Sequence, residues 1–142
     1  MLRYNELVKV YNELASMSRY DRMHNAKAAY EKLESLLQEK MGHGPGYFAA
    51  TRVACALVAA DGQLTRAEHE MFREFATSSC TYDELYDSAV SISKDFKSVL
   101  DIITTRGSEI RFVAGYLAAA IFAEKGMLGE NEEAVFRIFA ED

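Results

Sequence analysis

The sequence predicts an all-α protein, folded as a single-domain bundle of about seven or eight helices. Three observations predict this fold. Only one proline, Pro45, interrupts the 142 residues, and no segment alternates apolar and polar residues as a half-buried strand does. Apolar residues recur instead at spacings of three and four, which places them on one face of a helix. Finally, one helix-turn-helix pattern occurs twice, at residues 53–76 and 117–140.

The bulk composition excludes several classes of function. Apolar residues make up 49% and charged residues 27%, as in ordinary soluble domains. The net charge of −6 argues against nucleic-acid binding and against anchoring to an anionic membrane surface. The longest uninterrupted apolar run, residues 112–123, is too short to span a bilayer. Charged residues near the start argue against a signal peptide, and the isolated Cys55 and Cys80 provide no disulfide framework, so a cytoplasmic protein is expected.

Residues 1–41 are expected to form an N-terminal helical hairpin packed on the core. The second helix, residues 22–41, carries an apolar seam that would pack against a partner helix. Gly42 should end this helix, and the His-Gly-Pro-Gly run at 43–46 is interpreted as a linker to the second region, residues 46–142. The seam comprises Met23, Ala26, Tyr30, Leu33 and Leu37.

The second region should begin with a helix over residues 47–60, which is apolar on nearly all sides and therefore central to the bundle. Asp61 and Gly62 form a turn. Thr65 and Glu68 then match a capping box, in which each side chain satisfies a free backbone N–H at the start of the next helix.

Five more helices complete the prediction. The helix after Thr65 should bury Met71, Phe72 and Phe75. Two shorter helices should follow, one of them from about residue 93. Ser108 is expected to cap a second central helix over 109–124, and the last helix should cover 130–140.

The internal repeat is visible without a gap. Residues 53–76 and 117–140 are identical at 10 of 24 positions. Both copies also carry rows of small residues in the central helix, which predicts that the two central helices cross in the middle of the bundle. The identities lie at Ala54, Ala56, Ala59, Gly62, Leu64, Glu68, Phe72, Arg73, Phe75 and Ala76 in the first copy.

Residues 53–64 with Glu68, and the degenerate copy that ends at Glu132, resemble the TerB-like family, which includes the tellurite-resistance protein TerB and the N-terminal domain of the co-chaperone DjlA. The resemblance covers roughly residues 46–142. It implies an all-helical bacterial domain of two similar halves, a role in stress response, and metal binding by acidic residues after each Asp-Gly. The second copy departs from the pattern, because Lys125 stands where an Asp is expected, so a symmetric pair of metal sites is not implied.

These acidic residues could bind a divalent cation. Gly62, Leu64 and Glu68 fit the end of a calcium-binding loop, but apolar residues occupy the first and third ligand positions of that loop. A purely structural interpretation also stands, in which Asp61 belongs to a turn and Glu68 to a capping box. The candidate metal ligands are Asp61, Glu68, Glu124 and Glu132, with Glu70 as an alternative to Glu132 beside Asp61 and Glu68.

No catalytic set is recognisable. His24, His43 and His69 lie near no cysteine at the spacing of a zinc site, and the chain has no Gly-rich phosphate loop or nucleophile elbow. We therefore expect a non-enzymatic TerB-like domain that binds an unidentified protein partner, with or without a metal ion. The alternative is a small enzyme, or a binder of anions or metabolites, that uses a cleft between the two repeats. The protein would be a monomer, or a homodimer with the seam of residues 23–37 as its interface.

Overall fold

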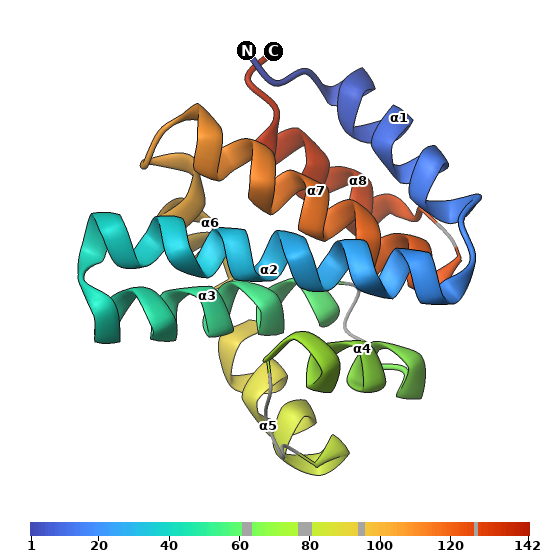
Figure 1. The fold of residues 1–142 in the computed structure, drawn as a ribbon, viewed down its shortest axis with the longest axis horizontal. Coiled ribbons are helices and arrows are strands. Elements are labelled where there is room, and N and C mark those ends of the chain that lie inside the picture. The colour runs from blue at the N-terminus through green and yellow to red at the C-terminus, as the bar shows by residue number, and fades with distance from the viewer. Residues whose placement is uncertain (61–63, 77–80, 94–95, 127) are drawn as a thin grey trace.

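The computed structural model describes residues 1–60, 64–76, 81–93, 96–126 and 128–142, and within these ranges it contains eight α-helices and no strand (Figure 1). The predicted all-α fold is therefore confirmed. The helices are α1 (Tyr4–Ala15), α2 (Arg19–Met41), α3 (His43–Val58), α4 (Arg66–Ala76), α5 (Tyr82–Ser93), α6 (Phe96–Thr104), α7 (Ser108–Lys125) and α8 (Glu130–Phe139). No helix of the described ranges is both long and apolar enough to cross a bilayer.

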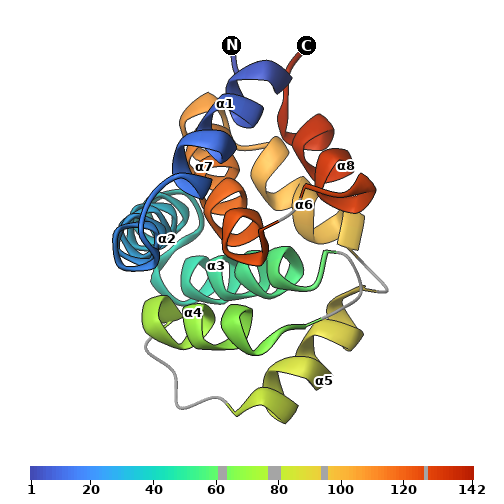
Figure 2. The same cartoon turned by 90° about the vertical axis from the view of Figure 1, so that its right-hand side faces the viewer.

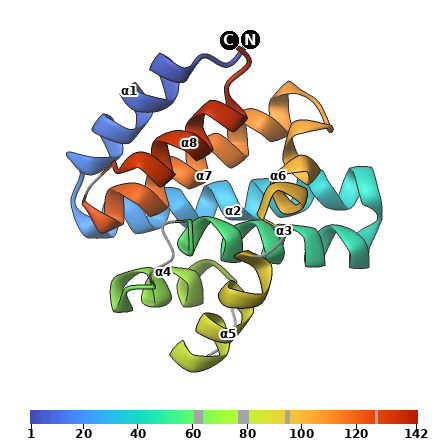
Figure 3. The same ribbon diagram turned by 180° about the vertical axis from the view of Figure 1, so that it is seen from behind.

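Helix α2 is at the centre of the packing. It lies against α3 and α7, and these are the two most extensive helix–helix contacts among the described residues. Figure 1 shows α2 and α3 side by side, with α7 on the other side of α2. Helix α1 packs mainly across α7 and α8, as Figure 3 shows from behind. Residues 1–41 thus share one core with the rest of the chain. Helices α1 and α2 make their main contacts with later helices and not with each other.

The apolar seam of α2 is buried against other helices of the same chain. Ala26, Tyr30, Leu33 and Leu37 are each at most 2% exposed, and Met23 is half-buried. The homodimer interface considered for residues 23–37 is therefore wrong, because α3 and α7 of the same chain already cover most of this seam.

The linker predicted at residues 43–46 is also wrong. Gly42 does end α2, with a φ of 96° that favours glycine, but α3 begins at the next residue. Pro45 fits there because the first N–H groups of a helix have no acceptor within it, so a missing N–H costs nothing. Gly46 lies where α3 meets α2: a Cβ at this position would be 2.5 Å from the Cα of Gln38. Gly46, one of the glycines that suggested a loop, instead allows two helices to approach closely.

The predicted start of α4 is confirmed. The backbone N–H of Glu68 donates to Thr65 Oγ1 at 3.1 Å, and the N–H of Thr65 donates to Glu68 Oε1 at 3.1 Å, which completes the capping box. Met71 and Phe72 are buried, whereas the side chain of Phe75 lies outside the described residues.

The predicted start of α7 needs a correction. Its N-cap is Gly107, with a φ of 100°, and no side chain caps the helix; Ser108 is already its first residue. Gly107 can adopt a positive φ without steric cost. The chain therefore turns into the helix at Gly107, one residue before the serine that was expected to cap it.

The second helix of each repeat copy begins at the equivalent position. Helices α4 and α8 begin 64 residues apart, at Arg66 and Glu130, which is the offset of the sequence repeat. Gly126 ends α7 in the left-handed conformation, with a φ of 84°, whereas its counterpart Gly62 lies outside the described residues. In the view of Figure 2, α4 and α8 lie on opposite sides of the central helices α3 and α7. That the two copies superpose stays a prediction.

Candidate functional site

Three glutamates of the repeat copies are buried close to where α2, α4, α7 and α8 come together. Glu68 of α4 is 1% exposed and Glu132 of α8 is 3% exposed. The side chain of Glu124, in the last turn of α7, is 4% exposed. These are three of the four candidate metal ligands, and the fourth, Asp61, lies outside the described residues. Buried carboxylates require compensation, so their partners define what the site can do.

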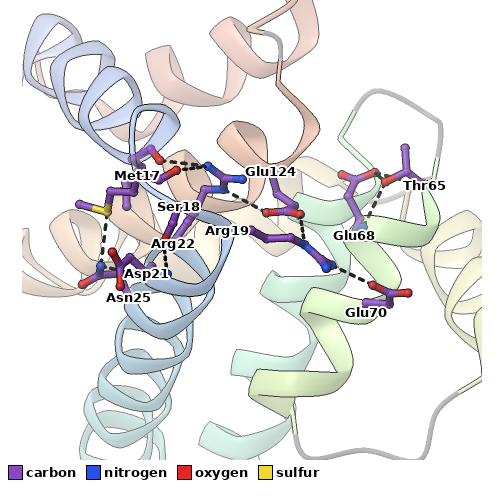
Figure 4. Close-up of polar contacts among 11 residues, drawn as sticks. Met17, Ser18, Arg19, Asp21, Arg22, Asn25, Thr65, Glu68, Glu70 and Glu124 are labelled. Carbon is purple, nitrogen blue, oxygen red and sulfur yellow. Dashed lines mark hydrogen bonds and ion pairs between the residues drawn. The ribbon is translucent and has the colours of Figure 1, made fainter.

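The carboxylate of Glu124 is bound by two arginines of α2 (Figure 4). Arg19 Nε donates to Oε1 at 2.8 Å, and Arg22 Nε donates to Oε2 at 3.0 Å. Arg19 also extends to α4, where its Nη2 donates to Glu70 Oε2 at 2.8 Å. Arg19 therefore ties α2, α4 and α7 together at one point.

Arg22 has a second role at the end of α1. Its Nη1 donates to the carbonyl oxygens of Leu14 at 3.3 Å and Met17 at 3.2 Å. These carbonyls lie at and just after the end of α1, where few backbone donors remain, although the Leu14 carbonyl also accepts from the N–H of Met17 at 3.2 Å. One guanidinium thus donates to carbonyls at the end of α1 and to one of the two oxygens of Glu124.

Sequence analysis missed both arginines. It placed the start of α2 near residue 22, whereas the helix starts at Arg19, after an N-cap by Ser18 whose side chain accepts from the N–H of Asp21. A Ser three residues before an Asp is a recognised helix-start signal. It would have put Arg19 and Arg22 on one face of the helix, but it could not have identified Glu124 as their partner.

Glu132 is paired with a lysine of the second repeat copy. Lys125 Nζ lies 3.2 Å from Glu132 Oε1, and the lysine side chain is 13% exposed. In the repeat, Lys125 occupies the position of Asp61. The second copy therefore carries its own cation beside the buried glutamate.

Glu68 differs from Glu132 in its partners. Among the described residues, its carboxylate accepts hydrogen bonds from Thr65, through N–H and Oγ1, both at 3.1 Å. Burial and the charge on Glu132 raise the pKa of Glu68 to about 7, against the opposing effect of the Thr65 hydrogen bonds. Glu68 can therefore gain or lose a proton near neutral pH.

The described residues contain no group of three or more His, Cys, Asp or Glu side chains arranged to hold a metal ion. Each oxygen of Glu124 is bound to an arginine, and Oε1 of Glu132 is bound to Lys125. No buried side-chain nitrogen or oxygen in the described part of the chain lacks a hydrogen-bond partner. Because Asp61 lies outside this part, a cation at Asp61 and Glu68 stays a prediction.

A groove at the surface adjoins this cluster. It has a volume of about 720 Å³ and lies between one stripe of α2 and one stripe of α4. Arg19 and Glu70 belong to its lining, so their ion pair connects the groove to the buried Glu124. Sequence analysis did not single out this surface. The lining residues are Arg19, Tyr20, Met23, His24, Lys27, Glu70, Arg73 and Glu74.

Comparisons with known proteins gave no relative: no family model, no curated protein and no solved structure matches the chain.

Proposed function

We propose that the chain is a non-enzymatic, TerB-like interaction domain that binds a protein partner through the groove between α2 and α4. The observation that carries this proposal is Tyr20 on the wall of that groove. Its side chain is 80% exposed, more than any other large hydrophobic residue of the described chain. Exposed aromatic residues beside a concave surface are typical anchors of protein interfaces.

The buried charges support a scaffold role rather than a catalytic one. Glu124 binds both Arg19 and Arg22, and Arg19 extends to Glu70 on the opposite wall of the groove. Each oxygen of the Glu124 carboxylate is already held by a guanidinium. These contacts would hold the two walls at a fixed separation, which favours binding by reducing the entropy lost on association.

The resemblance of residues 46–142 to TerB-like proteins supports a role in a cytoplasmic stress response of the tellurite type. It also supports a divalent cation beside Glu68. The charge on Glu132 already disfavours a second charge on Glu68, and a cation bound there would offset this repulsion.

Site-specific crosslinking tests the proposed interface. A photoreactive phenylalanine analogue replaces Tyr20 in one variant and Phe112, an exposed aromatic residue of α7 outside the groove lining, in a second. We expect position 20 to crosslink a discrete partner in cells that express the full chain, and position 112 not to do so.

The partner identified in this way would then be purified and its affinity measured by calorimetry. Tyr20→Ala should weaken binding at least about tenfold, as for an interface anchor, and Phe112→Ala should change it less than about twofold. Equal effects of the two substitutions, or a crosslink from position 112 alone, would reject the groove as the interface.

A further inference from the structure

We infer that the segment which occupies the groove between α2 and α4 is acidic and carries an apolar side chain that packs against Tyr20 and Met23. This inference rests on the proposed function and names the chemical class of its partner.

The charges that line the groove support an acidic occupant. Arg19 already pairs with Glu70, so these two contribute little net charge to a ligand. Lys27 of α2 and Arg73 of α4 also line the groove, one from each wall, and neither forms an ion pair within the described residues. Glu74 is the one remaining carboxylate of the lining. Two uncompensated cations on opposite walls suit a chain of carboxylates that lies between them.

The contrast with the rest of the molecule strengthens this argument. The whole chain carries a net charge of −6, whereas the groove lining holds three cations and two carboxylates. An acidic segment is repelled by most of the surface and attracted here, so electrostatics direct it to one place. A basic segment would be drawn to the remainder of the surface instead.

A second hollow continues the surface past α4. It has a volume of about 690 Å³, shares Glu70 and Arg73 with the groove, and adds Arg66, His69 and Asp83. Arg66 and Arg73 lie seven residues apart, which places them on one face of α4. These two arginines extend the row of cationic positions along α4, which suits a segment of several residues better than a single carboxylate.

The apolar contact comes from α2. Tyr20 and Met23 lie three residues apart on the same face of the helix, and His24 and Lys27 continue this face. The tyrosine ring is largely exposed, whereas Met23 is half-buried. Methionine adapts to different apolar partners, so this position can accept a leucine or a phenylalanine.

Nuclear magnetic resonance of the full chain tests the inference with two synthetic peptides. One alternates Glu and Asp with Leu and Phe, and the other has Lys in place of every acidic residue. The acidic peptide should shift the backbone amides of residues 19–27 and 70–74, and raising the salt concentration should weaken its binding. The basic peptide should leave these amides unchanged.

Two double variants with the same charge change supply the control. Lys27→Glu combined with Arg73→Glu should lower the affinity for the acidic peptide at least about tenfold. Lys9→Glu combined with Lys97→Glu, on α1 and α6, should lower this affinity less than about threefold. Circular dichroism confirms that both variants are folded.

The outcomes separate this inference from the proposed function. Equal weakening in both double variants, amide shifts outside the groove, or tighter binding of the basic peptide at the groove would overturn the acidic occupant. The interface itself would still stand if position 20 crosslinks a partner. Crosslinking from position 112 alone would reject the interface, whatever the peptides show.

Discussion

Glu68 and Glu132 occupy the same place, the third residue, in α4 and α8, and both are buried. Their partners differ. Lys125 neutralises Glu132, whereas Glu68 has the hydroxyl and N–H of Thr65. Burial, followed by the charge on Glu132, raises the pKa of Glu68 to about 7. Equivalent positions in the repeat thus hold one glutamate with a lysine partner and one whose pKa is raised by burial.

This difference predicts a pH-dependent stability. The pKa of Glu68 is 4.5 when unperturbed and about 7 in the fold, so between these values the folded protein binds a proton that the unfolded chain releases. The free energy of unfolding should therefore fall as pH rises from about 4.5 to about 7, by up to roughly 3 kcal/mol, and then level off. Urea denaturation followed by circular dichroism across this range measures the change.

Glu68→Gln isolates this effect, because glutamine stays neutral and can still accept from Thr65. The variant should be more stable than the parent at pH 8, and the gap should close towards pH 5. Glu130→Gln, at an exposed position of α8, is the matched control and should leave the pH profile unchanged. The same decline with pH in Glu68→Gln as in the parent would show that another group causes it.

Arg22 and Arg19 should contribute unequally to stability. Arg22→Ala leaves half of the charge on the buried Glu124 without its partner and removes the donor to two carbonyls at the end of α1. It should cost about 3 kcal/mol in urea denaturation, as for a broken buried ion pair. Arg19→Ala removes a side chain that is 52% exposed and should cost no more than about 1 kcal/mol. A larger loss for Arg19→Ala would contradict this order.

Two neighbouring glycines at the start of α3 should respond in opposite directions to alanine. At Gly46 a Cβ would lie 2.5 Å from backbone atoms of Gln38, so Gly46→Ala should force α2 and α3 apart and cost at least about 2 kcal/mol. At Gly44 a Cβ meets nothing within 4 Å, so Gly44→Ala should stabilise by about 0.5 kcal/mol through helix propensity. Thermal unfolding of both variants tests the α2–α3 contact directly, and equal melting temperatures would refute it.

The predicted cation site at Asp61 and Glu68 can be tested separately. If Asp61 and Glu68 hold a divalent ion, calorimetric titration of the full chain with calcium, magnesium or zinc should show saturable heat, and the bound ion should raise the melting temperature. Asp61→Ala should abolish both effects, whereas Asp83→Ala should preserve them. The absence of saturable heat, or an unchanged response in Asp61→Ala, would end the metal hypothesis.

The fold class followed from local patterns. The capping box of Thr65 and Glu68, and the stop at Gly42, depend on residues within a few positions of one another, so the sequence alone was enough to locate them. The same reliance on local signals caused the errors. Residues 43–46 have the composition of a loop, but they form the first turn of α3, where Gly46 packs against α2.

The sequence by itself determined that this chain is helical, where α4 begins and α2 ends, and which glutamates are candidates for a site. Only the tertiary structure decided the partners of these glutamates. Arg22 lies 102 residues from Glu124, and Glu70 lies 51 residues from Arg19. A helix is fixed by contacts three and four residues apart, whereas the compensation of a buried charge depends on which distant helices are packed together.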